Sequence, residues 1–425
     1  MVVYACVLSC CMHGQPSRDF AAFRDAFVTT YKKLEIRPAA PSYADNLQNI
    51  PRLPDIQQQL AFFRDAEKKI AGFANLWLGE EELLDLDMMK FETNLNLQRL
   101  ALEKKWAEEK PSVIPSGNIY QIPHGKEWYT YLLNRYTGEN VNADEIFLND
   151  SEEATRLGRQ IDTLAAAHGL SLQQLIIHMQ DRAFAPETDT GKSTAVANAA
   201  RLIHSKMPLL FNQPSAFTVG FADEKLLPGN HPGEQYHTHV TSMYLYKLLP
   251  GAYYQQQLAA RAVKSPVQAL FRYDNFTNAW AAYAETLGKE MDVYSSFYEE
   301  ISQLQCALLR CVRSVLDIGI NFYGWADDKA INTWQAYMPA GVGNVQQEIY
   351  AVKHLPAHAV ACSYGCMLFV QWKKELQARQ GSSFNIRDFH DRLLKKGALP
   401  FFMVKKNVFR KSASAHTSGI STATR

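Results

Sequence analysis

The sequence carries almost no net charge, because 44 lysine and arginine residues oppose 43 aspartate and glutamate residues and leave a formal charge of +1. Proteins that bind nucleic acid usually have a basic surplus or a basic stripe. We therefore expect no nucleic-acid partner. Glycine and proline are also sparse, at 22 and 18 residues in a chain of 425. This composition excludes a fibrous or linker-rich protein.

The chain also lacks the cysteine spacings of a disulfide framework or of a zinc ribbon. Its 7 cysteines form no CxxC pair, and Cys6, Cys10 and Cys11 lie at the start of the chain. Cys362 and Cys366 are one helical turn apart, which suits neighbouring thiols better than a disulfide. Because free cysteine behaves as a small apolar side chain, we predict core thiols.

Long hydrophobic runs are absent, and the apolar run at residues 1–11 is too short to cross a bilayer. It ends in Val-Leu-Ser-Cys at Cys10, which resembles the end of a bacterial lipoprotein signal. This interpretation predicts a signal remnant over residues 1–15, a lipid anchor on Cys10 and a place in the cell envelope or periplasm. Against it, the first basic residue is Arg18. The alternative is a buried N-terminal segment in a cytoplasmic protein.

Helical periodicity is the dominant pattern. Between residues 297 and 315 the apolar side chains recur at steps of three and four, which predicts a long core helix: Phe297, Ile301, Leu304, Leu308, Val312 and Val315. Residues 276–291 show the same period. Alternation of apolar and polar residues is scarce, and residues 216–221 are the best strand candidate. The sequence predicts a mainly α protein with few short strands.

Composition divides the chain further. Amphipathic stretches at residues 56–77 and 80–109, bounded by prolines, predict an N-terminal helical lobe over residues 16–110. A segment without helical period follows as a connector, and a second helical region covers residues 126–410. Residues 411–425 are rich in serine, threonine and alanine. Because they offer too little apolar surface to offset their ordering entropy, we predict a disordered tail.

The most informative stretch is YKLLPGAYYQ at residues 246–255. It is followed by NAWAAYAE from Asn278, RCVRSVLDIGIN from Arg310, and FHD with GALP from Phe389. In this order the motifs resemble a bacterial family of helical zinc peptidases catalogued as domain of unknown function 885. Its members carry HExxPGHxxQ, EGWAxYxE, RxxRxxxDxGxH, PGQAxxYxxG and FHDxxLxxGxLP. The resemblance covers about residues 223–408, and it implies a gluzincin-like helical architecture around a deep cleft.

The departures from the family pattern fall on the reactive positions. Tyr246 and Lys247 stand at the His-Glu pair, Ala252 at the second histidine, Asn278 at the glutamate of EGW and Asn321 at the last histidine. We call these five the vestigial positions. Zinc hydrolysis needs imidazole and carboxylate ligands with a carboxylate base, and an ammonium group repels a divalent cation. The resemblance therefore implies a catalytically inactive pseudopeptidase without a cofactor.

Four charged residues of the family pattern remain, namely Glu285, Arg310, Arg313 and Asp317. Charges inside an apolar stretch must be paired, because burying them singly is costly. They form either a structural ion-pair network or a binding site in which an arginine holds a peptide carboxylate by a bidentate fork. The second interpretation predicts a peptide or protein ligand in the former active-site cleft.

Two other functions remain open from the sequence. Glu234, His237 and His239 have the donor types and the short spacing of a relocated zinc site, which would make the chain an active hydrolase. The third hypothesis is a helical envelope scaffold without a ligand. His354 and His358 are four residues apart, but Pro356 lies between them. We interpret this pair as surface or cap histidines rather than as a metal site.

Overall fold

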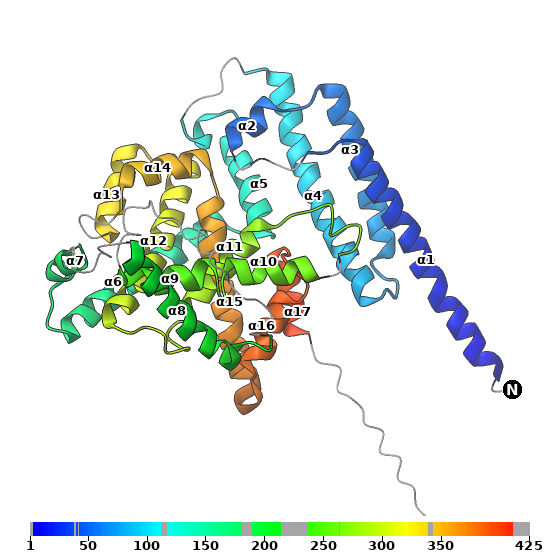
Figure 1. Ribbon diagram of the computed structural model, residues 1–425. Helices are drawn as coiled ribbons and strands as arrows, with labels where there is room; N and C mark the ends of the chain where they lie inside the picture. Colours follow the sequence, from blue (N-terminus) through cyan, green and yellow to red (C-terminus); the bar gives the residue numbers. More distant parts are fainter. Residues whose placement is uncertain are drawn as a thin grey trace, which may run out of the picture.

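The computed structural model describes residues 3–37, 40, 42–111, 117–180, 189–213, 237–262, 264–338 and 343–410. In these ranges every regular element is a helix (Figure 1), which confirms the predicted mainly α class. The strand candidate at residues 216–221 and the tail at 411–425 lie outside the described residues. In chain order the helices are α1 (Val3–Lys33), α2 (Tyr43–Gln48), α3 (Leu53–Phe73), α4 (Glu80–Glu109), η1 (Ile119–Gln121), α5 (Gly125–Thr137), α6 (Ala143–Ala167), α7 (Leu172–Gln180), α8 (Asp189–Leu210), α9 (His237–Lys247), α10 (Ala252–Arg261), α11 (Asp274–Thr286), α12 (Phe297–Asn321), α13 (Asp327–Tyr337), α14 (Val345–His354), α15 (His358–Gln380), η4 (Gly381–Ser383), α16 (Ile386–Leu394) and α17 (Phe401–Phe409).

Three long helices at the N-terminal end lie side by side, with α1 outermost and α3 against α4 (Figure 1). Aromatic rings join them, as where Phe27 of α1 meets Phe62 of α3 with ring centroids 5.2 Å apart. The predicted amphipathic stretches fall largely within α3 and α4. Helix α1 runs without a break through residue 15, where the sequence suggested a boundary. The division into lobes stays a prediction.

The long helix predicted from residue 297 is α12, which packs against α6, α9, α13, α14 and α15. Ser296 caps its first turn by accepting a hydrogen bond from the Glu299 amide. Its apolar stripe is buried, with Ile301, Leu308 and Val312 at 0–1 % exposure. Because neighbouring helices cover α12 on several sides, several of its polar residues, such as Ser314, Asp317 and Asn321, are buried as well.

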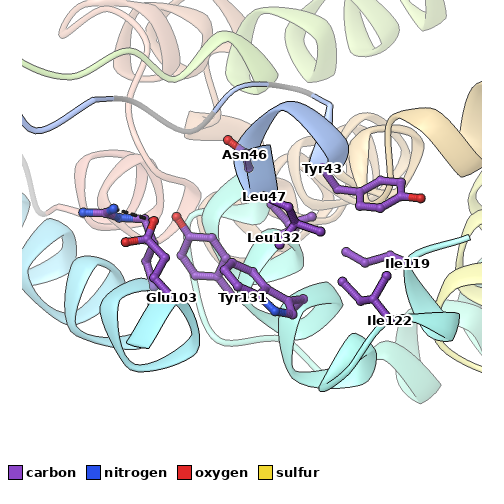
Figure 2. Close-up of a pocket in the computed structure, with 10 residues that line it drawn as sticks. Tyr43, Asn46, Leu47, Glu103, Ile119, Ile122, Tyr131 and Leu132 are labelled. Atoms are coloured by element: carbon purple, nitrogen blue, oxygen red, sulfur yellow. Dashed lines mark hydrogen bonds and ion pairs between the residues drawn. The ribbon is translucent and has the colours of Figure 1, made fainter. Parts of the chain in front are cut away.

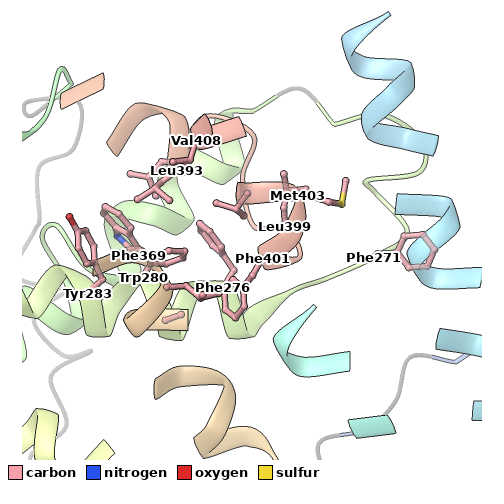
Figure 3. Close-up of a cluster of buried hydrophobic side chains, with 14 of the residues drawn as sticks. Phe271, Phe276, Trp280, Tyr283, Phe369, Leu393, Leu399, Phe401, Met403 and Val408 are labelled. Carbon is pink, nitrogen blue, oxygen red and sulfur yellow. The ribbon is translucent and has the colours of Figure 1, made fainter. Parts of the chain in front are cut away.

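Helices α11 and α15 pack closely, and Gly365 makes this possible. A Cβ atom at Gly365 would lie 2.4 Å from the Ala279 Cβ and 2.3 Å from the Phe401 ring. Figure 3 shows the apolar cluster around this contact, in which Phe276 of α11, Phe369 of α15 and Phe401 of α17 lie close together. The close approach aligns the start of α11 with the start of α15.

A carboxyl group is buried where α6, α12 and α15 meet. Asp150 of α6 is 3 % exposed and accepts a hydrogen bond of 2.6 Å from the Ser363 hydroxyl of α15. Burial raises the pKa of Asp150 to about 7, against the opposing effect of the Ser314 and Ser363 hydroxyls. Asp150 is therefore protonated in the folded protein well above the pH at which an exposed aspartate ionises.

In the part of the chain that the structure describes, none of the helices combines the length and the apolar character that crossing a bilayer requires.

Candidate functional site

The turn between α9 and α10 is held against α11 by residues that the family pattern retains. The Trp280 indole N–H donates to the Pro250 carbonyl at 2.7 Å, and the Thr277 hydroxyl donates to the Gln255 side-chain oxygen at 2.8 Å. Both bonds are buried, where an unmade hydrogen bond is costly. These retained residues therefore position the vestigial positions of α9 and α10, independently of any catalytic role.

Gly251 lies in the same turn, and a Cβ atom there would approach the Tyr246 carbonyl oxygen to 1.9 Å. Gly251→Ala is expected to lower the free energy of unfolding by about 2–3 kcal/mol, because backbone atoms cannot move aside as a side chain can. Gly158→Ala is the matched control, since a Cβ on that helix would meet nothing within 4 Å. It should stabilise the protein by about 0.5–1 kcal/mol. Urea unfolding measures both, and equal effects would contradict the packing of this turn.

A buried ion pair lies beside Tyr246. Arg310 Nη1 of α12 is 2.6 Å from Glu285 Oε2 of α11, and the two side chains are 13 % and 2 % exposed. The Arg310 guanidinium carbon is 5.9 Å from the centroid of the Tyr246 ring, which places a cation over an aromatic face. Burial raises the pKa of Glu285, and Arg310 opposes this shift. The pair thus fills the space next to the first vestigial position.

Three cysteine thiols surround this ion pair. Cys362 Sγ donates to the Asn278 carbonyl at 3.5 Å and shares a hydrogen bond with the Tyr246 hydroxyl. Cys306 donates to the Glu285 carboxylate. Burial raises the pKa of Cys306, Cys362 and Cys366 above the ordinary value of a thiol. Because the thiolate is the nucleophile and the metal ligand, these thiols are poorly suited to either role at neutral pH.

The vestigial positions are brought together only in part. Tyr246 and the Asn278 backbone both contact Cys362. Lys247 ends α9 and Ala252 begins α10, and both side chains are partly exposed, whereas the Asn278 side chain is exposed. Lys247 as a whole residue is therefore not fully buried.

Asn321 lies apart from the other vestigial positions. It ends α12, 11 residues beyond Arg310, which is about 16 Å along the axis at the α-helical rise per residue. Its amide donates to the Val352 carbonyl at 2.8 Å and to Asp317 Oδ1 at 3.0 Å. The structure therefore assigns Asn321 to the packing between α12 and α14.

Asp317 holds the start of α15 in place. Its Oδ1 accepts hydrogen bonds from the Ala357 amide at 3.0 Å and the Tyr129 hydroxyl at 3.1 Å. Ala357 is the N-cap of α15 and has a positive φ of 68°. A carboxylate suits the positive end of a helix. Burial raises the pKa of Asp317 to about 7, and the Ala357 amide opposes this shift.

Arg313 forms a third, separate contact. Its Nε and Nη2 each donate to a Glu348 oxygen of α14 at 2.6 Å, and its side chain is 39 % exposed. The retained charged residues therefore form three groups rather than the single network that their spacing suggested. The physical reason is that steps of three and four spread along α12, so each residue meets a different neighbour. Sequence patterns missed Glu348 and Tyr129, because neither lies in a family motif.

The side chains around Tyr246 do not suit zinc. They offer a phenol and protonated thiols in place of imidazole and carboxylate, and the one nearby carboxylate, Glu285, is paired with Arg310. Across the described ranges, no three His, Cys, Asp or Glu side chains are grouped to hold a metal ion. The relocated zinc site is not covered by this statement, since Glu234 and the side chains of His237 and His239 lie outside what the structure describes. The Cys10 side chain lies outside it too.

A small pocket between α2, η1, α4 and α5 is shown in Figure 2, where Tyr43, Ile119 and Tyr131 border it. Its volume is about 20 Å³. A cavity needs about 10–15 Å³ to hold one water molecule. This pocket is therefore too small for an organic ligand.

Comparison with known proteins supports the resemblance drawn from the motifs. A family described as "Bacterial protein of unknown function (DUF885)" matches residues 230–408. This range contains all five vestigial positions, so the resemblance is confirmed over that part of the chain. No curated protein matches the chain.

Two solved structures have a similar fold. One is described as a "putative lipoprotein" from Colwellia psychrerythraea, with a TM-score of 0.62 and 18 % identity over 83 % of this chain and 68 % of that chain. The other is described as a "putative lipoprotein of unknown function" from Shewanella oneidensis, with a TM-score of 0.50 and 14 % identity over 84 % of this chain and 72 % of that chain. At these identities the likeness shows the fold alone.

Proposed function

We propose that this protein is a catalytically inactive relative of metallopeptidases that binds a peptide or protein partner at the former active site. The observation that carries this proposal is the Tyr246 side chain, a phenol hydrogen-bonded to the Cys362 thiol at the position where the family motif has a histidine. Burial raises the pKa of Cys362, and the pKa of Tyr246 is raised as well, so both groups are protonated and neither is a zinc ligand at neutral pH. The chemistry left there is recognition by hydrogen bonds and charge, which needs no activated water.

The remaining polar groups of the site support binding rather than catalysis. Glu285 is paired with Arg310, so it is not available as a general base. Arg313 is the accessible fork, because it is 39 % exposed at the surface. Its bidentate contact with Glu348 supports this role, because a peptide carboxylate could form the same two hydrogen bonds by displacing Glu348.

We also propose that the protein is a lipoprotein of the cell envelope, anchored by a lipid on Cys10. Two observations support this location. The sequence Val-Leu-Ser-Cys at residues 7–10 resembles a lipoprotein signal, and both structural neighbours are described as "putative lipoprotein". Labelling of cells with a radioactive fatty acid should mark the protein, and Cys10→Ala should abolish the label.

Restoring the family's ligands tests the ancestry of the site. The variant Tyr246→His, Lys247→Glu, Ala252→His and Asn278→Glu should bind about one zinc ion per chain, because it recovers the three ligands and the base of a hydrolytic site. The wild-type protein should bind substoichiometric zinc. Metal analysis after dialysis without chelator, and calorimetric titration with zinc, measure both.

Asn321→His is the matched control for this experiment. It also restores a family histidine, but at a position about 16 Å along α12 from Arg310, so it should leave zinc binding at the wild-type level. A folded fourfold variant without added zinc affinity would count against the alignment of the vestigial positions. Firm stoichiometric zinc in the wild-type protein would instead favour the relocated site at Glu234, His237 and His239.

A peptide library screened for turnover and for binding separates the three functions. Saturable binding without cleavage supports the proposal, and cleavage supports an active hydrolase. The absence of both binding and cleavage supports the envelope scaffold. Arg313→Gln should weaken peptide binding about tenfold or more, since a charge-assisted bidentate contact contributes roughly 1.5–3 kcal/mol.

A further inference from the structure

A cavity separate from the vestigial positions lies where five segments meet. Its volume is about 330 Å³. The end of α1, the end of α5, the start of α11, the start of α15 and the segment before α17 border it. None of the vestigial positions lines it. This size falls in the range of small-molecule sites, and it is about twice that of a cavity that admits benzene.

An arginine with spare donors lines this cavity. Arg135 of α5 makes a single side-chain hydrogen bond to a described residue, to Glu92 at the long distance of 3.5 Å. The other Glu92 oxygen accepts from the Tyr273 hydroxyl at 2.8 Å. A guanidinium group has five N–H donors in a planar fork. Most of the Arg135 fork is therefore left for a group that the cavity receives.

Two buried polar atoms beside Arg135 also have no partner among the described residues. They are the hydroxyl of Tyr136 and Nε2 of His358, and both side chains line the cavity. Their rings are in contact, with centroids 4.3 Å apart. Burial lowers the pKa of His358, with Asp274 opposing the shift, so its neutral ring can donate through Nε2. Buried polar atoms without partners are uncommon and costly, which points to a bound polar group.

The charges around the cavity are balanced. Arg135 and Arg272 are its cations, and Glu92 and Asp274 are the nearby carboxylates. Arg272 is exposed and forms no ion pair within the described ranges, while Asp274 at the start of α11 is exposed as well. A dianion such as phosphate would meet no net positive charge here. A single carboxylate needs only the Arg135 fork and the two unpartnered donors.

Much of the remaining lining is apolar and includes aromatic rings. Phe271, Phe276 and Phe401 all line the cavity, and Figure 3 shows Phe271 set apart from the other two rings. Tyr31 closes the end formed by α1. Such walls favour an apolar body, which gains about 25 cal/mol for each Å² removed from water. The volume of the cavity leaves room for one ring and a short chain.

We propose that this cavity binds a small carboxylic acid with an apolar body, whose carboxylate contacts the Arg135 fork. The Tyr136 hydroxyl and His358 Nε2 are covered in the unliganded protein, and they reach the carboxylate by a shift of their side chains when it binds. The apolar body lies against Phe271, Phe276 and Phe401. This inference does not depend on the proposed function, because it concerns another part of the molecule. Aryl-alkanoic acids and short fatty acids share this chemistry, and the length of the apolar body distinguishes them.

Calorimetric titration of the full-length protein tests the proposal with 3-phenylpropanoate and its neutral counterpart 3-phenylpropanamide. The carboxylate should bind saturably and at least about tenfold more tightly than the amide, because hydrogen bonds to a charged group are stronger than those to a neutral one. Comparing the affinity of octanoate with that of 3-phenylpropanoate decides between a fatty acid and an aryl acid. Tighter binding of either acid supports a carboxylate site in this cavity. Equal binding of acid and amide, or binding of neither acid, overturns the proposal.

Tyr136→Phe is the decisive variant, because it removes only the unpartnered hydroxyl. It should weaken binding of the acid about tenfold while leaving the unliganded protein as stable as the wild type or more stable. Arg135→Lys keeps the charge but loses the fork, and should weaken binding at least as much. Arg156→Lys on the exposed face of α6 is the control and should change nothing. Unchanged affinity in a folded Tyr136→Phe variant would contradict the assigned contacts.

Discussion

Replacing Arg310 with methionine is expected to lower the free energy of unfolding by about 3–5 kcal/mol, because it leaves the Glu285 carboxylate buried without its cation. Glu285 is 2 % exposed, and its ion pair with Arg310 measures 2.6 Å. Burial already raises the pKa of Glu285 in the presence of Arg310, and removing the cation raises it further. The loss should therefore be largest above neutral pH and smaller in acid, where Glu285 is protonated. Urea unfolding of the variant and the wild type, above neutral pH and in acid, measures this loss.

Two further variants show whether the charge or the packing is responsible. Arg313→Met removes an arginine of the same helix whose partner Glu348 is reached at the surface, so it should cost less than about 1 kcal/mol. The double variant Glu285→Leu, Arg310→Met removes both charges and should recover most of the lost stability. Equal losses in the two arginine variants would show that the Arg310–Glu285 pair is solvated in solution.

The stability of Asp150→Asn relative to the wild type is expected to increase as the pH rises towards about 7 and to level off above it. Asp150 has a pKa of about 7 in the folded protein, raised by burial from an ordinary value of 3.8. The unfolded chain ionises first as the pH rises, so the wild-type protein loses stability between these two values, by on the order of 4 kcal/mol in all. The asparagine variant has no such loss.

Urea unfolding of both proteins at pH 5.5 and pH 8 measures this difference. The stability of Asp150→Asn relative to the wild type should grow by about 2 kcal/mol over that interval, which is roughly 1.4 kcal/mol for each pH unit below the folded pKa. The Ser314 and Ser363 hydroxyls can rotate to accept from the asparagine amide. Asp162→Asn, at an exposed position of α6, is the control. A constant difference between wild type and variant would show that Asp150 is ionised in the folded protein.

The helical architecture and the region that resembles the family could be predicted from local patterns. The steps of three and four from Phe297 to Val315 identified α12, and α12 extends that stripe to Asn321. The motif order around Pro250 and Gly251 identified the region that the family matches. These features are local, since they depend on side chains a few residues apart in the chain.

The partners of the charged residues could not be predicted in the same way. Arg310 and Arg313 are three residues apart on α12, yet one pairs with Glu285 of α11 and the other with Glu348 of α14. Asp317 contacts the start of α15 instead. A helical pattern gives the face on which a residue lies, but it does not show which helix covers that face. For the same reason the contact of Asn321 with Val352 of α14 could not be predicted.

The cavity beside Arg135 has no signature in the sequence at all. Its lining comes from segments as distant as Tyr31 and Phe401, and no motif connects them. His358 was interpreted as a surface or cap residue, whereas its Nε2 is buried against Tyr136. The sequence by itself determined the helices and the region that resembles the family, because helical periodicity and motif order depend on residues close together in the chain. Only the tertiary structure decided which charges pair and where space remains, because both depend on how helices far apart in the chain pack against one another.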